Sequence, residues 1–416
     1  MSFTAIQAQL RLGLLGILIA GAAMWACSTS DHASDTDSSL PDATIDTAVD
    51  SAPVDAAPVV DGGTPRLALY TVKTDGTGLR LVLDTGTREI SHARLSADGW
   101  LVGTRYGKDP DGNGLAMENE ANIGAYYEGT QIVVFKLSAP SAQTVIAGST
   151  VAGLAANPSW TDDGKVIFLS AEPDAGVLGT HIARASFSVV PTVSSITTVL
   201  VPSQLVIPVD PHQQGSSDAT GTVSFSAAID LAVKWQRPVW SMPASGTTSM
   251  QAVAFVGCPL CQSQKGCCAW TNFGDVLGTN DSRFSHAGTD IMWMQQHPDV
   301  SVPVGNVMLY PFRQVVRPLD GGPQMDLVAP ATAATTTLSY GEWRADDQEI
   351  VYWSIEVEGS VLRQFLWAMS RDGSGRRKIP LPANLCPLHP SYVSASEIVF
   401  NAWRSAADGT CDVAKL

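Results

Sequence analysis

One pattern recurs along residues 66–416 and constrains the fold more than any other feature of the chain. It is an apolar strand, a tight polar turn and a second apolar strand, as in Leu95 to Gly99 leading into 100–104. An Asp-Gly turn between two apolar strands is a strong signal for a β-hairpin. The copies fall near residues 95, 160, 225, 286, 344 and 393, with the copies near 225 and 286 weaker than the rest.

A second hairpin follows some of these copies. The strand 67–72 runs into the turn 74–78, and the strand 365–370 runs into the turn 371–375. A looser version begins at 238–242 and continues to 246. The short runs are rich in β-branched and aromatic residues, and long amphipathic helical patterns are hard to find, so we expect an all-β protein.

The pairing of an inner Trp/Ser-x-Asp-Gly hairpin with an outer x-Asp-Gly-x-Gly hairpin resembles the TolB-like (WD40-like) β-propeller repeat. The resemblance covers most of 66–416 and implies a β-propeller, with six blades favoured and seven left open. An array of β-sandwiches is the competing architecture. Four-stranded blades cannot bury both faces alone, so they stack radially into a ring.

The two ends of this body are incomplete units. The hairpin at Leu67 lacks inner strands of its own, and the unit at 391–400 has inner strands but little chain after them. We therefore expect the N- and C-terminal strands to complete one blade and close the ring.

The N-terminus has the features of an export signal. Arg11 supplies a positive charge, residues 12–26 are almost wholly apolar or small, and Cys27 follows Ala26 directly. This arrangement resembles a bacterial lipoprotein signal, although Trp25 is bulky for its position. The resemblance implies a signal peptide over 1–26 and a lipid on Cys27. A plain secretory signal or an uncleaved anchor is the alternative, but the apolar run is shorter than the ~20 residues that span a bilayer.

Residues 27–65 form the lipidated Cys27 and a tether of different composition. Eight aspartates, no lysine or arginine and no aromatic residue occur in 28–65, so we expect this segment to be disordered. The net charge of −15 leaves about −8 for 66–416 once the tether acids and Arg11 are set aside. No dense Lys/Arg stripe is present, which argues against a nucleic acid partner.

Six cysteines remain after Cys27, and an even number in an exported chain favours three disulfides. Cys386 and Cys411 bracket the last repeat, so we expect them to pair. Two further bridges are expected to join Cys258 and Cys261 to Cys267 and Cys268, with the partners left open. A tetrahedral zinc site made by the same four sulfurs is the alternative.

A calcium-loop pattern lies between two expected strands. Asp109, Asp111 and Asn113 alternate before Gly114, and Glu120 occupies the twelfth position, which is the spacing of an EF-hand loop. The flanks read as strands rather than helices, so a bound Ca²⁺ would be structural. The alternative is an ordinary Asp/Gly-rich turn.

His92, His286 and His389 lie just before or within inner hairpins, and equivalent positions in a propeller converge on its axis. We take His92 and His389 as axial candidates, with a structural role expected. No Gly-x-Ser-x-Gly elbow, P-loop or His-Glu-x-x-His motif is present.

The sequence therefore predicts a propeller held on the membrane by its N-terminal lipid, in a bacterial cell envelope and at the outer membrane. We expect it to bind or scaffold a protein, peptide or glycan, and we do not expect catalysis. A TolB-type component of an envelope complex is one alternative. A metal-dependent polysaccharide lyase or hydrolase using the axial funnel is the other.

Overall fold

The computed structural model describes a part of the chain that lies entirely within one compact unit, 51–416. The unit 1–50 lies outside the described residues, as does the rest of the segment before Arg66, so the signal peptide, Cys27 and the tether stay predictions. The described residues are 66–109, 112, 114–117, 129–148, 154–161, 163–171, 180–200, 210–217, 222–228, 239–243, 251–254, 279–296, 302–304, 307–309, 312–320, 325–327, 336–358 and 361–404.

Every regular element in these residues is a β-strand, and the strands form six four-stranded antiparallel sheets and one two-stranded ribbon. None of the described segments is a helix that is long and apolar enough to cross a membrane. The first three sheets in chain order contain β3 (Ile90–Leu95), β4 (Trp100–Arg105), β5 (Gln131–Lys136) and β6 (Ala139–Ala147); β7 (Leu154–Trp160), β8 (Val166–Ala171), β9 (Thr180–Val189) and β10 (Thr192–Leu200); and β11 (Asp210–Ser217), β12 (Thr222–Ala228), β13 (Val239–Pro243) and β14 (Gln251–Ala254).

The next two sheets follow the same order along the chain, and the sixth combines both ends of the body. The ribbon of β17 (Val302–Val304) and β18 (Val307–Leu309) is inserted within the fourth sheet's chain segment. The remaining sheets contain β15 (Thr279–Phe284), β16 (Asp290–Gln296), β19 (Phe312–Pro318) and β20 (Met325–Asp326); β21 (Thr336–Trp343), β22 (Glu349–Glu358), β23 (Val361–Ser370) and β24 (Arg377–Ile379); and β1 (Arg66–Lys73), β2 (Arg80–Gly86), β25 (Leu385–Tyr392) and β26 (Glu397–Arg404).

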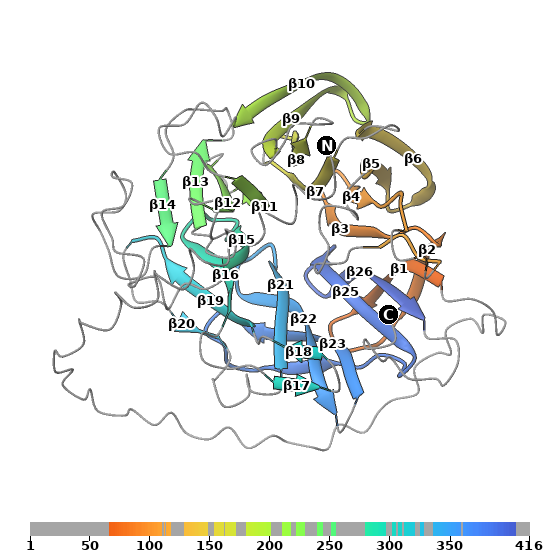
Figure 1. The fold of residues 1–416 in the computed structure, drawn as a ribbon, viewed down its shortest axis with the longest axis vertical. Helices are drawn as coiled ribbons and strands as arrows, with labels where there is room; N and C mark the ends of the chain where they lie inside the picture. The colour runs from red at the N-terminus through yellow and green to blue at the C-terminus, as the bar shows by residue number, and fades with distance from the viewer. Residues whose placement is uncertain are drawn as a thin grey trace, which may run out of the picture. The chain divides into compact units, whose positions relative to one another are not determined.

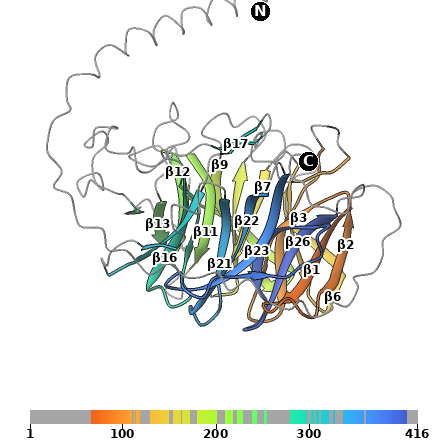
Figure 2. The same cartoon turned by 90° about the horizontal axis from the view of Figure 1, so that it is seen from below.

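The sheets are arranged around a common centre, with β3, β7, β11, β15, β21 and β25 innermost (Figure 1). Each inner strand contacts the inner strand of the next sheet, and these contacts run in an unbroken circle from β3 through β25 and back to β3. Figure 2 shows the same sheets from the side, standing next to one another. The expected all-β propeller is therefore confirmed.

The two ends of the body meet in one sheet with the order β2-β1-β26-β25. β1 pairs with β26 in uninterrupted antiparallel register, from Arg66 opposite Arg404 to Lys73 opposite Glu397. The C-terminal hairpin supplies the inner strands and the N-terminal hairpin supplies the outer strands. The predicted closure of the ring by its own chain ends is confirmed.

The core consists of apolar layers between neighbouring sheets. One layer places Val134 of β5 and Val102 of β4 against Phe168 of β8, and all three side chains are buried. Burying a side chain of this size contributes about 1.5–3 kcal/mol. Because both faces of a sheet take part in such layers, no sheet is complete without its neighbours.

One predicted hairpin is misplaced. The sequence pattern put an inner turn near residue 225, but Phe225 lies in the middle of β12, opposite Gln214 of β11 and Trp240 of β13. The chain between β11 and β12, 218–221, lies outside the described residues. β12 forms a hairpin with β11 on one edge and pairs with β13 on the other. The sequence pattern shows the apolar strand but does not show on which side of it the inner turn lies, which explains the error.

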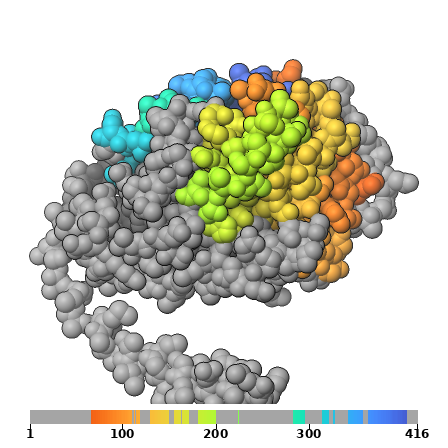
Figure 3. Space-filling view, turned by 90° about the horizontal axis from the view of Figure 1, so that it is seen from above, coloured from red at the N-terminus to blue at the C-terminus, as the bar shows by residue number. Residues whose placement is uncertain are grey.

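The outer hairpin of β9 and β10 reaches the surface of the molecule, where it forms a continuous patch (Figure 3). Val189 is 70% exposed and Ile196 is 50% exposed, the largest values among the big apolar side chains that the structure describes. The β9–β10 hairpin therefore lies on the outside of the ring.

Candidate functional site

The six inner strands share one irregularity that determines what faces the axis. In each strand, two residues oppose one on the neighbouring strand, which is a β-bulge. The bulge is flanked by Ser91 and Arg94 in β3 and by Leu388 and Ser391 in β25. The equivalent flanks are Ala156 and Ser159, Gln214 and Ser217, Asn280 and Arg283, and Ser339 and Glu342.

The first inserted residue of the bulge has a left-handed backbone in three of these strands. His92, Asn157 and His389 have φ values of 52°, 51° and 45°. Asparagine tolerates this region best among non-glycine residues, whereas histidine is found there less often. Two histidines at equivalent strained positions are therefore placed by the repeat itself, and such strain is concentrated at functional sites.

In three of the six inner strands, the residue after the bulge is charged, and these three residues form a cluster on the axis. Arg94 Nε lies 3.0 Å and Arg283 Nε lies 3.4 Å from the same oxygen, Glu342 Oε2. The Arg94 side chain is 10% exposed and that of Arg283 only 2%. Arg94 Nη1 also donates to the carbonyl of Pro158 at 2.7 Å. Three sheets therefore join at one carboxylate in the centre of the ring.

The two axial histidines lie together. Their ring centroids are 4.2 Å apart, and both side chains are buried. The edge of Trp353 approaches His389 with centroids 6.0 Å apart. His286 does not join them, because it lies in the turn between β15 and β16 and is exposed. Of the three histidines singled out in the sequence, the structure therefore places His92 and His389 side by side at the same cavity.

A polar relay sets the hydrogen-bonding state of His389. The fully buried Glu89 accepts a hydrogen bond from Asn401 Nδ2, so Asn401 Oδ1 is turned toward His389 Nδ1 at 3.2 Å. Because an amide oxygen only accepts, Nδ1 carries a proton, and Glu89 Oε1 lies 3.8 Å from the same nitrogen. The relay thus orients the imidazole of His389, as the partners of histidines commonly do in binding and proton-transfer sites.

His92 is held neutral by its surroundings. Burial lowers its pKa well below the usual value, and the positive charge of Arg94 lowers it further. Protonation would place a second cation beside the guanidinium in a site with little water. The imidazole of His92 is therefore uncharged at neutral pH.

The axial groups surround a small cavity of about 10 Å³. This volume has room for roughly one water molecule. The cavity is lined by His92, Ala93, Arg94, Arg283, Gly341, Glu342, His389, Pro390 and Ser391. The space that these described side chains enclose is therefore small. No group of three or more His, Cys, Asp or Glu side chains that could hold a metal ion occurs among the described residues.

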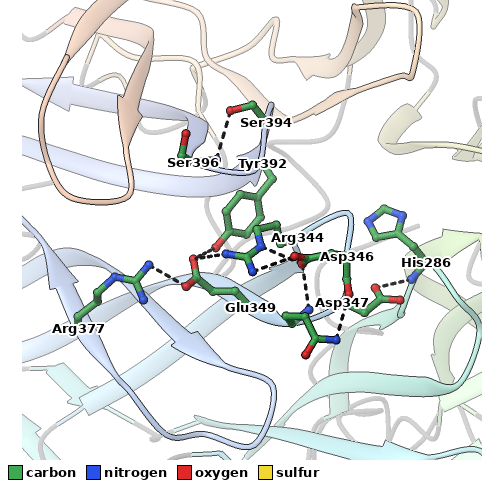
Figure 4. A network of polar contacts seen from close by, with 10 residues as sticks. His286, Arg344, Asp346, Asp347, Glu349, Arg377, Tyr392, Ser394 and Ser396 are labelled. Carbon is green, nitrogen blue, oxygen red and sulfur yellow. Dashed lines mark hydrogen bonds and ion pairs between the residues drawn. The ribbon is translucent and has the colours of Figure 1, made fainter.

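A separate polar network ties neighbouring sheets together at their inner turns (Figure 4). The carboxylate of Asp347 accepts hydrogen bonds from the backbone amides of His286 and Ala287 in the next sheet, at 2.7 and 2.8 Å. Glu349 accepts from Tyr392 at 2.6 Å and from Arg377 at 2.7 Å. These contacts connect the β15–β16, β21–β22 and β25–β26 hairpins, so the network is a structural clamp.

The tryptophans of the repeat have a comparable structural role. Trp160 Nε1 donates to the carbonyl of Arg94 at 3.1 Å, and Trp343 Nε1 donates to the carbonyl of Arg283 at 3.4 Å. Each indole reaches the inner strand of the preceding sheet, at the residue that carries the axial charge. The Trp of the sequence pattern therefore helps to position the arginines.

The remaining predicted sites are only partly described. Asp109 accepts hydrogen bonds from the amides of Gly112 and Gly114 at 2.9 and 2.7 Å, which closes the loop. Its proposed calcium partners Asp111, Asn113 and Glu120 lie outside the described residues, so the calcium site stays a prediction.

Among the cysteines, Cys386 is fully buried in β25 and disulfide-bonded. Its partner lies outside the described residues, and pairing with Cys411 stays a prediction. Cys258, Cys261, Cys267 and Cys268 lie outside as well.

Sequence reasoning missed the cluster of Arg94, Arg283 and Glu342. A usable signal existed, because each of these residues lies five positions before the left-handed residue of its turn: Gly99, Gly288 and Asp347. Counting seven positions back from Gly99 gives His92 in the same way.

Comparison with known proteins supports the fold. No protein-family model matches the chain, and no curated protein matches its sequence. A candidate TolB from Agrobacterium tumefaciens aligns with a TM-score of 0.55 and 11% identity, over 82% of this chain and 100% of that one. At this identity the likeness shows the fold alone, and it confirms the TolB-like propeller.

Two other solved structures overlap less closely. A protein of unknown function from Dyadobacter fermentans aligns with a TM-score of 0.47 and 10% identity, over 81% of this chain and 98% of that one. An oligogalacturonate lyase in complex with manganese aligns with a TM-score of 0.43 and 10% identity, over 81% and 82% of the two chains. Because the TM-scores of these two alignments are low, neither similarity supports a conclusion about fold or activity.

Proposed function

We propose that this chain is a binding module of the bacterial cell envelope, a six-bladed propeller that recognises a protein, peptide or glycan at the mouth of its axis. Cys27 would carry the lipid and hold the module at the outer membrane. The observation that carries the proposal is the axial cluster, whose arginines and histidines enclose a cavity of only about 10 Å³. A partner group would therefore meet these fixed side chains from outside.

The chemistry of the axial cluster favours recognition over turnover. Arg94, Arg283 and Glu342 are buried and mutually paired, so their positions are fixed before any partner arrives. Preorganised polar groups bind with less loss of side-chain entropy than flexible ones. The cluster is held by the inner strands β3, β15 and β21 of three sheets. Such a rigid scaffold keeps the charged groups in place for a binding partner.

A pull-down after chemical crosslinking in intact envelopes tests the proposal with the full chain. Wild type is compared with Arg94→Met, which removes one axial guanidinium, and with Lys136→Met, a matched change at a surface lysine over Trp100. We expect a reproducible partner that Arg94→Met reduces at least tenfold and Lys136→Met leaves unchanged. An identical set of captured molecules from all three proteins would refute recognition at the axis.

The TolB-type alternative is tested by the same captures. Enrichment of a peptidoglycan-associated lipoprotein would support a role in that kind of envelope complex. Its absence from a pull-down that captures another partner would dismiss that alternative and leave the binding module in place.

The enzyme alternative has one observation in its favour, the buried pair of His92 and His389 with a polar relay that orients His389. Elemental analysis of the purified protein, together with His92→Asn and His389→Asn, addresses a metal-dependent lyase or hydrolase. Stoichiometric metal that both substitutions remove would support it, and metal-free protein that still binds its partner would count against it.

A further inference from the structure

The strand β10 lies at the end of its sheet, in the order β10-β9-β8-β7, and runs along the outside of the ring (Figure 1). Its sequence is Thr-Val-Ser-Ser-Ile-Thr-Thr-Val-Leu, which contains no charged residue and no proline. No described strand pairs with its outer edge. An edge strand presents backbone N–H and C=O groups to any further strand, and natural sheets usually protect it with charges, proline or a short length.

The other outer strands that the structure describes have such protection. β14 is four residues long and β20 is two residues long. β24 contains Arg377 and Lys378, and β2 contains Arg80 and Asp84. β6 has a proline near its start, Pro140. Among the described outer strands, β10 therefore has the edge that is best suited to pairing with another strand.

A regular stretch in the middle of β10 is available for such pairing. The register of β10 with β9 is continuous from Ser195 to Thr198, and irregularities interrupt it on both sides. Residues 194–198 are all exposed, and Ile196 is 50% exposed. Because irregularities of this kind bend a strand, a partner strand would pair with the middle of β10 and not with its ends.

The chemistry of this exposed stretch is the same when it is read in either direction. Ile196 stands at the centre, Ser194 and Ser195 precede it, and Thr197 and Thr198 follow it. In an antiparallel pair of two copies centred on Ile196, each hydroxyl would lie opposite a hydroxyl, and the two isoleucines would lie opposite each other. Cross-strand hydroxyl pairs stabilise a sheet, and contact between the isoleucines removes apolar surface from water. The stretch is therefore complementary to itself.

The charges around β10 also permit two copies to meet. Arg184 of β9 lies opposite Thr197 and is half-buried. In a sheet continued through two copies of β10, the two Arg184 residues would be three strand spacings apart, roughly 14 Å. This separation exceeds the Debye length of about 8 Å at physiological ionic strength. The whole chain has a net charge of −15, so an uncharged edge lets two copies approach with little local repulsion.

We propose that β10 pairs with β10 of a second copy of this chain, antiparallel and centred on Ile196. Two four-stranded sheets would then join into one continuous sheet across a two-fold axis. Because the paired stretch is short, the buried area lies at the low end of specific interfaces and the dimer is weak. The inference concerns the outside of the ring and does not depend on the axial site.

Sedimentation velocity of the purified full chain, over concentrations that bracket the expected Kd, tests the proposal. We expect a monomer–dimer equilibrium with a Kd on the order of 100 µM. Ile196→Lys and Ile196→Glu should each abolish the dimer, because like charges would lie directly opposite each other. An equimolar mixture of these two variants should restore a dimer. Val189→Lys is the matched control, because Val189 is 70% exposed on the same hairpin but belongs to β9, and it should leave the Kd unchanged.

Two double variants test the register and distinguish strand pairing from a contact between sheet faces. In the proposed register, residue 195 of one copy lies opposite residue 197 of the other, on the sheet face away from Ile196. Ser195→Lys with Thr197→Glu should keep the dimer, because it places opposite charges across the two-fold axis. Ser195→Lys with Thr197→Lys should abolish it. Far-UV circular dichroism checks that each variant keeps the fold of the wild type.

Three results would overturn the proposal. The first is a wild-type chain that stays monomeric throughout the concentration range. The second is a dimer that Ile196→Lys leaves intact. The third is the same behaviour of the two double variants, because strand pairing in this register requires them to differ. Arg94→Met should not change the Kd of the dimer, and Ile196→Lys should not change capture of a partner at the axis, so this proposal and the axial proposal fail independently.

Discussion

Asp347 provides a quantitative test of how the sheets are held together. It occupies the left-handed turn position, with φ of 57°, where the chain places Gly99, Gly164 and Gly288 in three other inner hairpins. Its carboxylate is the group that crosses to the next sheet and accepts the amides of His286 and Ala287. The backbone conformation of Asp347 therefore costs stability, whereas the hydrogen bonds of its carboxylate add stability.

Two substitutions separate these contributions. Asp347→Gly removes both hydrogen bonds to the carboxylate and leaves the backbone relaxed, whereas Asp347→Ala removes the same bonds and puts a Cβ into the left-handed region. Hydrogen bonds to a charged group contribute about 1.5–3 kcal/mol each, but His286 and Ala287 are exposed and water can replace part of that. We expect Asp347→Gly to lower stability by roughly 2–3 kcal/mol, and alanine by about 1–2 kcal/mol more.

Thermal unfolding followed by far-UV circular dichroism measures the difference. With roughly 2–4 °C per kcal/mol for large domains, glycine should lower the Tm by about 5–10 °C and alanine by several degrees more. Asp346→Ala is the control, because Asp346 bonds only Arg344 and Gln348 of its own turn and is 52% exposed. A glycine variant as stable as wild type would refute the clamp. Equal melting of the glycine and alanine variants would refute the backbone argument.

Further predictions concern the protonation of His92 and Tyr392, the disulfide of Cys386 and the candidate calcium loop that begins at Asp109. Because the pKa of His92 is lower in the folded chain than its usual value near 6.5, stability is full above that pH and falls as the pH drops below it. His92→Asn should flatten the dependence of Tm on pH below about 6.5. Burial and the hydrogen bond to Glu349 raise the pKa of Tyr392, so stability is full below pH 10 and is lost as the pH rises above it, less steeply in Tyr392→Phe. Cys386→Ser should destabilise the closing sheet by roughly 3 kcal/mol, seen as an earlier urea midpoint. Millimolar Ca²⁺ should raise the Tm of wild type but not of Asp109→Asn, and an unchanged wild-type melt would leave an ordinary loop.

The sequence predicted the propeller because turn chemistry is local. Asp98-Gly99 and Asp163-Gly164 mark their hairpins through the left-handed residue that the turn requires, and the strands on either side follow. Closure of the ring was predictable for the same reason. The N-terminal end has an outer hairpin without inner strands, and the C-terminal end has inner strands without an outer hairpin, so the two ends complete one sheet.

The axial cluster could not be predicted because it depends on a bulge that leaves no trace in hydrophobic alternation. One extra residue in β3, β15 and β21 turns Arg94, Arg283 and Glu342 toward one another. In the sequence the three are isolated charges that look like ordinary surface residues. The third hairpin was misplaced because Phe225 has pairing partners on both sides, and a periodic pattern does not say how many neighbours a strand has.

The sheet shared by β1 and β26 has a consequence for how the molecule is made. β1 can pair with β2 early, but its second partner, β26, is complete only when residue 404 has been synthesised, so one edge of β1 stays open for nearly the whole chain. Pairings between such distant residues form slowly. A product that stops short of β25 would leave the apolar β1–β2 hairpin without the inner strands that cover it, and would therefore be open to proteolysis and aggregation.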